Sequence, residues 1–175
     1  MHLEKLSLNP PASLIPFLED LGIGENGFGG SQIDQADFSL PDFLQGYCDM
    51  AILDRVKPGN AQQSNFGVLN DEETVIGMLK IRHTLTVRTE ISGGHIGYYI
   101  HGSHRGRGNG KRSLELGLGK LMTFGVIRVL VTIYPENTVS IKVALAAGGI
   151  YDDTVTDPAN GKAIHRYWID LNPSS

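Results

Sequence analysis

The chain has 175 residues and a mass of 19.0 kDa, a size that predicts a single domain. Hydrophobic residues make up 41% and charged residues 19%, so the chain can bury a packed core. The net charge of −4 argues against a protein that binds nucleic acid through bulk charge. The single cysteine, Cys48, excludes an internal disulfide and a zinc site built from cysteines. No apolar run approaches the length of a signal peptide or a membrane span, so we expect a cytoplasmic protein.

The first 64 residues carry few strong signals. Residues 14–21 predict a short helix, and the glycine-rich stretch over 22–30 reads as a loop. Ser39, followed by Pro41 and Asp42, is typical of a helix N-terminus. The apolar spacing then favours a helix over 40–55.

From residue 65 the pattern changes to strands. Residues 65–70 and 74–86 predict a hairpin, and 93–101 predict a further strand that leads into a glycine-rich loop. Further segments predict, in order, a helix, a buried strand, a second helix and a closing hairpin, over 111–125, 126–134, 136–149 and 150–171. The second half is therefore predicted to run β-β-β-α-β-α-β-β.

Glycine is over-represented, with 22 residues in the chain, nine of them between Gly93 and Gly119. Part of this group lies in a loop from His104 to Lys111, between a predicted strand and a predicted helix. Such a loop directs backbone N–H groups at one place beside the positive end of a helix, and its basic side chains add charge. A diphosphate is the ligand that this pattern favours.

Three phosphate motifs compete for the loop. A Walker A motif fails because Arg105 stands at its first glycine and Arg112 at its hydroxyl position. A dinucleotide fingerprint fails because Lys111 replaces its last glycine. The pattern [Gln/Arg]-x-x-Gly-x-[Gly/Ala] is satisfied by Arg105, Gly108 and Gly110.

With this motif the sequence resembles the GNAT N-acetyltransferase superfamily. The 26 residues between Gly110 and Asn137 fit that family's helix and next strand, and Asn137, Ser140 and Gly148 resemble its Asn-x-x-Ser…Gly block. The ending HRYWIDL, the pair Arg82-His83 and the Gly-Gly-His at 93–95 resemble a poorly characterised bacterial branch of predicted acetyltransferases. The resemblance implies an α+β fold with a mixed, mostly antiparallel twisted sheet, splayed central strands and flanking helices.

The resemblance also implies a division of the chain. A single acetyltransferase domain would span 1–175, with an acetyl-CoA-binding core over 65–172 and a variable helical segment over 1–64 on the acceptor side. Acetyl-CoA would be the cosubstrate and an amine the acceptor, attacked directly in a ternary complex. Members commonly dimerise, so a homodimer is one expectation, whereas nucleic acid and membrane are not expected partners.

Site residues follow from the same resemblance. Main-chain amides of the loop would bind the CoA diphosphate, the preceding strand would pair with the pantetheine arm, and the Asn137 block would contact it. The residues so implicated are Tyr99, Ile100, His101, Arg105, Gly106, Arg107, Gly108, Asn109, Gly110, Lys111, Asn137, Ser140 and Lys142. Two departures are that Gly102 replaces a common proline and Ala144 replaces the tyrosine that protonates the leaving thiolate in many members.

Transfer to an amine needs a base near neutral pH, and histidine has a suitable pKa. His95, near a strand position where some members keep a glutamate base, is the first candidate, and His83 is the second. A backbone N–H near Tyr99 or Ile100 would hold the oxyanion. Candidates for the acid are Tyr134, Tyr98 and Tyr151, of which Tyr134 completes the predicted catalytic set.

Simpler interpretations stay open. A histidine in a strand is more often a hydrogen-bonded structural residue than a catalyst, and Asn137 can serve only as a helix N-cap. The chain can be a non-catalytic sensor of CoA or acetyl-CoA with the same fold, which Ala144 favours, or a nucleotide-binding domain. The histidines show no close metal-ligand spacing, so no metal is predicted.

Overall fold

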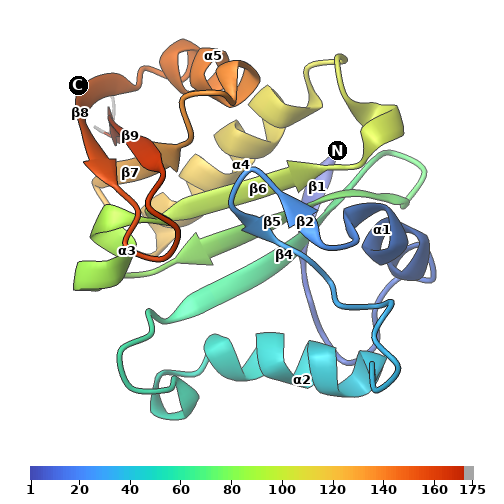
Figure 1. Ribbon diagram of the computed structural model, residues 1–175. Helices are drawn as coiled ribbons and strands as arrows, with labels where there is room; N and C mark the ends of the chain where they lie inside the picture. The colour runs from blue at the N-terminus through green and yellow to red at the C-terminus, as the bar shows by residue number, and fades with distance from the viewer. Residues whose placement is uncertain (172–175) are drawn as a thin grey trace.

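The computed structural model describes residues 1–171, so Asn172, the last residue of the predicted core, lies outside the described residues. Figure 1 shows the arrangement of the chain. The elements are β1 (His2–Lys5), α1 (Leu14–Leu21), β2 (Gly24–Glu25), β3 (Phe28–Gly29), α2 (Leu40–Met50), η1 (Leu53–Arg55), β4 (Gln63–Leu69), β5 (Val75–Arg82), α3 (Val87–Ile91), β6 (Ile96–Ile100), η2 (Gly102–His104), α4 (Asn109–Thr123), β7 (Arg128–Ile133), α5 (Thr138–Ala146), β8 (Ile150–Thr156) and β9 (Ala163–Asp170).

The predicted order of the second half is confirmed, with the short α3 inserted between β5 and β6. The Ser39 hydroxyl accepts the Asp42 N–H at 3.4 Å, as a helix N-cap does, and α2 begins where it was predicted. The helix predicted over 40–55 is too long, because it ends at Met50 and the extended backbone of Ile52 separates it from η1.

The glycine-rich stretch over 22–30 is not only a loop. β2 and β3 pair as a two-stranded hairpin, with Glu25 opposite Phe28. Asn26 and Gly27 both adopt positive φ, at 50° and 83°, as the two central residues of a tight hairpin turn do. The Asn-Gly pair was therefore a signal for this hairpin in the sequence.

The strands form two main antiparallel sheets, in the orders β1-β4-β5-β6 and β7-β9-β8. This arrangement confirms the expected mixed fold with a mostly antiparallel sheet. β1 comes from the segment that was predicted to be helical and variable, and it pairs with β4 over His2–Lys5. Among the described residues, one backbone–backbone hydrogen bond joins the two sheets, from His95 N–H to Leu130 C=O at 2.8 Å.

Helices cover both faces of the first sheet. One core lies between the strands and the helices α4 and α5, and the second lies beneath α1, α2 and the β2–β3 hairpin. Figure 1 shows α5 and α2 on opposite sides of the strands. None of the helices in the described part of the chain has the length and apolar character that crossing a bilayer needs.

α4 packs unusually close to the sheet at Gly117. A Cβ atom at this position would lie 2.3 Å from Ile96 Cδ1 and 2.7 Å from Leu79 Cδ2. Glycine thus allows close helix-to-sheet packing here, because a Cβ would force the Ile96 and Leu79 side chains to shift, although glycine lowers intrinsic helix propensity. The helix brings its N-terminus to the end of β6 as a result of this packing.

Candidate functional site

The glycine-rich loop connects β6 to α4, as predicted. After η2, the backbone turns at Gly106 and Gly108, whose φ angles of 72° and 81° are unfavourable for residues with a Cβ. The Asn109 side-chain amide donates to the His104 carbonyl at 2.8 Å and closes the loop. Gly110, in the first turn of α4, lies against the Tyr98 ring, because a Cβ there would be 3.4 Å from Tyr98 Cε2.

Six consecutive amides in this loop, from Gly106 to Lys111, donate to no acceptor within residues 1–171. The first amide of the helix that forms a bond is that of Arg112, which donates to the Gly108 carbonyl at 3.0 Å. A helix start always leaves some amides unpaired, but here the preceding loop adds Gly106, Arg107 and Gly108. Such a set of donors, beside the positive end of a 15-residue helix, suits a diphosphate.

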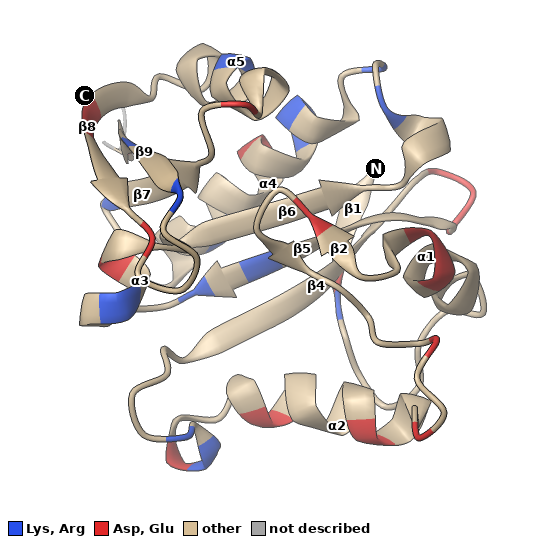
Figure 2. Ribbon diagram, in the orientation of Figure 1, with Lys and Arg blue, Asp and Glu red and all other residues tan. Residues whose placement is uncertain are grey.

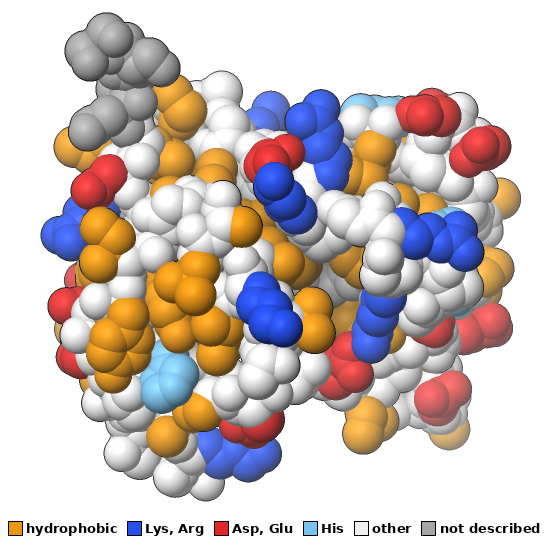
Figure 3. Space-filling view, turned by 90° about the horizontal axis from the view of Figure 1, so that it is seen from above, with side chains coloured by type: hydrophobic (Ala, Val, Ile, Leu, Met, Phe, Trp, Pro, Cys, Tyr) orange, Lys and Arg blue, Asp and Glu red, His pale blue; other side chains and the backbone are white. Residues whose placement is uncertain are grey.

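The basic side chains of the loop play different roles. Arg105 turns back into the fold: its Nε donates to the Ile100 carbonyl at 2.8 Å, and its guanidinium pairs with Glu25 on the hairpin. Lys111 lies 3.9 Å from Glu115 on the same helix. Arg107 is exposed and forms no ion pair with another residue of the described range. Figure 3, which looks down on this side of the molecule, shows basic side chains gathered on this face.

The strand before the loop has one unpaired edge. The His101 N–H donates to the Ile76 carbonyl of the β5 side at 2.9 Å. Because hydrogen-bonding direction alternates along an antiparallel strand, Tyr99 also directs its peptide groups to β5, whereas Tyr98 and Ile100 direct theirs to the opposite edge. The bond from Arg105 to the Ile100 carbonyl agrees with this alternation. Of Tyr99, Ile100 and His101, the strand residues predicted to pair with the cofactor, only Ile100 therefore presents its amide to the gap. The Tyr98 amide also faces the gap, although Tyr98 was not among the residues predicted to pair with the cofactor.

The Asn137 block begins α5, as expected. The Asn137 Oδ1 accepts the Ser140 N–H at 3.2 Å and caps the helix, while its Nδ2 donates to no acceptor in the described part of the chain. Tyr98 Oη lies 3.5 Å from Ser140 Oγ, so the tyrosine connects β6 to α5. Lys142 is exposed on the same helix. The structure thus brings Ser140 to the β6 edge.

His95, the first candidate for the general base, is only 8% exposed and lies where the two sheets meet. Its Nδ1 accepts the Leu130 N–H at 2.9 Å, so this ring nitrogen is unprotonated. Burial, together with the charge of Arg82, lowers the pKa of His95 to about 4. His95, with the Nδ1 lone pair engaged and a pKa of about 4, is a weak base. We expected a histidine that titrates near neutral pH.

His83, the second candidate, lies beyond the end of β5. Its Nε2 is 2.9 Å from the Ser64 hydroxyl, and its ring stacks on Phe124 at 4.0 Å, at the C-terminal end of α4. Burial lowers the pKa of His83 below its ordinary value. The glycine loop begins the other end of α4, so the structure does not bring His83 to the loop.

Tyr134 follows β7 and lines a pocket of about 350 Å³. One wall of the pocket is the β2–β3 hairpin, and the other carries Tyr134, Glu136, Asn160 and Lys162. The Tyr134 hydroxyl donates to Asp157 Oδ2 at 3.1 Å and accepts from Asn160 Nδ2 at 3.0 Å. Burial raises the pKa of Tyr134, which keeps the phenol protonated at neutral pH. Of the three predicted catalytic side chains, this one alone lines the pocket.

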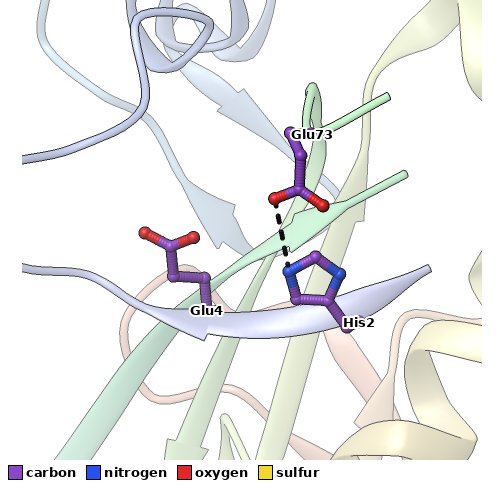
Figure 4. A group of neighbouring side chains, drawn as sticks. All are labelled: His2, Glu4 and Glu73. Carbon is purple, nitrogen blue, oxygen red and sulfur yellow. Dashed lines mark ion pairs between the residues drawn. The ribbon is translucent and has the colours of Figure 1, made fainter. Parts of the chain in front are cut away.

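A separate group of side chains could hold a metal ion. His2, Glu4 and Glu73 place one ligand atom each within 4.8 Å of one another (Figure 4). All three side chains are exposed, and they lie at the β1 edge of the first sheet, on elements that do not line the pocket. The group therefore has no role in the chemistry considered below.

The structure thus combines a divided antiparallel sheet with a glycine-rich loop of unpaired amides at the division, an arrangement that suits a ligand with a diphosphate group. Residues 41–150 match the acetyltransferase (GNAT) domain family. The chain belongs to this family, because the match covers more than half of its length. The family resemblance and the fold class are thereby confirmed, and acetyl transfer from acetyl-CoA is the activity that the family indicates.

Solved structures share the fold. A GNAT acetyltransferase of Streptococcus pneumoniae is 12% identical with a TM-score of 0.67, covering 97% of this chain and 98% of its own. A spermidine N-acetyltransferase SpeG chimera from Vibrio cholerae and hSSAT is 16% identical with a TM-score of 0.66, over 98% and 96%. The yncA structure of Salmonella typhimurium, which contains acetyl-CoA, is 12% identical with a TM-score of 0.63, over 93% and 90%. A search of curated proteins finds no match.

Proposed function

We propose that this chain is an acetyl-CoA-dependent N-acetyltransferase that acts on an amine in a ternary complex. The six unpaired amides from Gly106 to Lys111, next to the gap between β6 and β7, carry the proposal. These donors fit the two phosphates of CoA, and Gly106 and Gly108 leave open space around the backbone, since a Cβ at either position would contact no atom within 4 Å. Arg107 adds positive charge at the rim.

The pantetheine arm would enter the gap and pair with the free edge of β6. We assign the pairing donors to the amides of Tyr98 and Ile100, because those of Tyr99 and His101 are directed to β5. Asn137 Nδ2, which remains a free donor after Oδ1 caps α5, would reach the same arm together with Ser140. Acetyl-CoA supplies a thioester, whose carbonyl carbon is the electrophile. An amide on the β6 edge would hold the oxyanion that develops there.

The acceptor would approach through the pocket between the hairpin and Tyr134. Its neutral amine attacks the carbonyl carbon, the C–N bond forms, and the C–S bond breaks. The amine loses a proton to water, the thiolate gains one from a protein acid, and water restores the proton of that acid. Ala144 offers no phenol, so we assign the acid to Tyr134, whose protonated hydroxyl lies in the pocket. His95 is assigned a structural role because its pKa is lowered to about 4 and its Nδ1 accepts the Leu130 N–H. His83 is assigned one because it lies against Phe124, at the end of α4 opposite the glycine-rich loop.

This function is tested by calorimetric titration with acetyl-CoA, followed by thiol release in the presence of amines. Gly108→Glu places a side chain and a negative charge at the diphosphate position, at a backbone φ of 81°. It should abolish binding. Gly119→Glu, on the exposed side of the same helix with no atom within 4 Å of a Cβ, is the matched control and should bind normally. Equal affinity of the two variants would refute the role of the loop.

The alternative is a CoA sensor without catalysis, which Ala144 favours. A sensor binds acetyl-CoA but gives no acceptor-dependent thiol release across a panel of primary amines. Sustained release that depends on the amine excludes it. The single-domain organisation over 1–175, with residues 1–64 on the acceptor side, belongs to the same proposal, and the β2–β3 hairpin in the pocket wall supports it.

A further inference from the structure

Lys80 is a cation in an unusual position, on the middle strand of the first sheet. Its Nζ lies 4.1 Å from the centre of the Phe28 ring and 5.9 Å from that of Tyr47. Its one hydrogen bond is a long one, 3.5 Å to the Gly29 carbonyl. Burial is the main cause that lowers the pKa of Lys80 to about 8. The charge is therefore poorly compensated within the fold.

A second cation lies two residues along the same strand. Figure 2 shows the two basic positions of β5 in blue, the second at the end of the strand toward α3. Arg82 is committed to structure, because its Nη1 donates to the carbonyls of Gly93 and Gly94 at 2.8 and 3.0 Å. Its charge nevertheless contributes to the low pKa of Lys80. One face of β5 thus carries two positive charges, of which Lys80 contacts the hairpin.

No carboxylate within the described range forms an ion pair with Lys80 or Arg82. Glu25, the acidic residue of the hairpin, is already paired with Arg105. A partly buried ammonium is stabilised when an anion approaches it, and its own fold offers none here. A bound anion would supply the counter-charge that residues 1–171 do not provide.

The position of Lys80 indicates that such an anion would bind beside the pocket. Phe28 and Gly29, which contact Nζ, also line the pocket that we assign to the acceptor. Lys80 pairs across the sheet with Gly97, whose neighbour Tyr98 presents its amide to the cofactor gap. The Phe28 ring lies over Gly97, since a Cβ there would be 3.7 Å from Phe28 Cδ2, and Lys80 Nζ lies against the same ring. An anionic group of the acceptor would meet Lys80 close to the transferred acetyl group.

We infer that Lys80 binds a carboxylate of the acceptor, so that the amine acetylated by this enzyme belongs to an aminocarboxylate. The inference rests on the proposed function. A monoanion fits better than a phosphate, because Lys80 alone offers free donors while Arg82 is engaged by carbonyl groups. The carboxylate would accept a charge-assisted hydrogen bond from Nζ and direct the amine at the other end toward the thioester.

The test compares two small probes, N-acetylglycine and the uncharged N-ethylacetamide. Protein labelled with ¹⁵N-lysine is titrated with each probe, with and without CoA, and the Lys80 Nζ resonance is followed by NMR. The Lys80 resonance is assigned as the peak that is missing from the spectrum of Lys80→Met. We expect saturable binding of N-acetylglycine, about tenfold or more tighter than N-ethylacetamide, with a rise in the pKa of Lys80. Lys80→Met should remove the preference, and Lys80→Arg should restore part of it.

Lys57→Met is the matched control, since Lys57 is an exposed lysine that does not line the pocket. It should retain the preference for N-acetylglycine. Equal affinity for the two probes, no saturable binding of N-acetylglycine, or a preference that survives Lys80→Met would overturn the inference. Calorimetry with CoA is run on the same samples, so failure of the proposed function is recognised separately. The titration without CoA decides the carboxylate site in either case.

Discussion

His95 and Leu130 exchange two hydrogen bonds across the only point where the backbones of the two sheets are bonded within residues 1–171. The His95 N–H donates to the Leu130 carbonyl at 2.8 Å, and the Leu130 N–H donates to His95 Nδ1 at 2.9 Å. An imidazole nitrogen thus takes the place of a backbone carbonyl in the ladder. Beyond this point β6 is free of β7, and the edge proposed to receive the cofactor begins.

The first prediction concerns pH and His95. Its pKa is about 4 in the folded protein and about 6.5 in the unfolded chain. Between these values the unfolded chain binds more protons, so stability falls as the pH falls from 6.5 to 4. The loss reaches about 3 kcal/mol below pH 4. In His95→Asn an amide oxygen can accept the Leu130 N–H without titrating. Chemical denaturation from pH 7.5 to 4 should show a smaller loss for this variant, and parallel curves would contradict the assignment.

The second prediction uses two glycines on one helix. Gly117→Ala places a Cβ against Ile96 and Leu79 and should destabilise the protein by about 1–3 kcal/mol through overpacking. Gly119→Ala, with open space at its Cβ, should stabilise it by up to about 1 kcal/mol through helix propensity. Opposite shifts in the denaturation midpoint are expected. Shifts of the same sign would mean that α4 does not pack on the sheet as described.

The third prediction separates the two roles of Asn137. Asn137→Ser keeps an oxygen that caps α5 but removes the amide donor proposed for the pantetheine arm. We expect a change in stability of less than about 1 kcal/mol and about tenfold weaker binding of acetyl-CoA. Asn137→Ala should lose both. Calorimetry and denaturation on the two variants distinguish a cofactor contact from a simple cap, which would leave the affinity of Asn137→Ser unchanged.

The fourth prediction concerns the acid. Tyr134→Phe removes the hydroxyl that lies between Asp157 and Asn160. Loss of a positioned acid should lower kcat by about a hundredfold while the dissociation constant for acetyl-CoA stays the same. Tyr151→Phe, whose hydroxyl is at an exposed position beside Thr154, serves as the control with normal kcat. Activity of Tyr134→Phe equal to that of the unmodified protein would move the acid elsewhere.

The periodic part of the fold could be predicted from the sequence. β4, β5, β7 and the two long helices of the second half carry alternation or helical spacing over many residues, so their existence was clear. β1 and α3 span only four and five residues and carry too little pattern. The pairing of β8 with β9 is the predicted closing hairpin, whereas the pairing of β7 with β9 joins segments farther apart in the chain, which local pattern does not contain.

The candidate site also has features that the sequence predicts and features that it does not. The glycine-rich loop and its place between a strand and a helix could be predicted, because the clustered glycines, among them Gly106 and Gly108 with their positive φ, indicate a tightly turning backbone. Its binding of a cofactor stays a prediction. The environment of His95 could not be predicted, because the sequence does not show that its ring accepts a hydrogen bond from the Leu130 N–H. Lys80 was missed for a similar reason: only packing reveals that it lies under Phe28 without a carboxylate.

Arg105 belongs to the glycine-rich loop by sequence, yet its guanidinium pairs with Glu25 on the hairpin that forms one wall of the pocket. If the loop binds CoA and the pocket binds the acceptor, as we propose, this ion pair connects the two binding sites. An acceptor that orders the hairpin would then raise the affinity for acetyl-CoA, and reciprocity would require acetyl-CoA to raise the affinity for the acceptor by the same factor. Arg105 would be the residue through which the two affinities are linked.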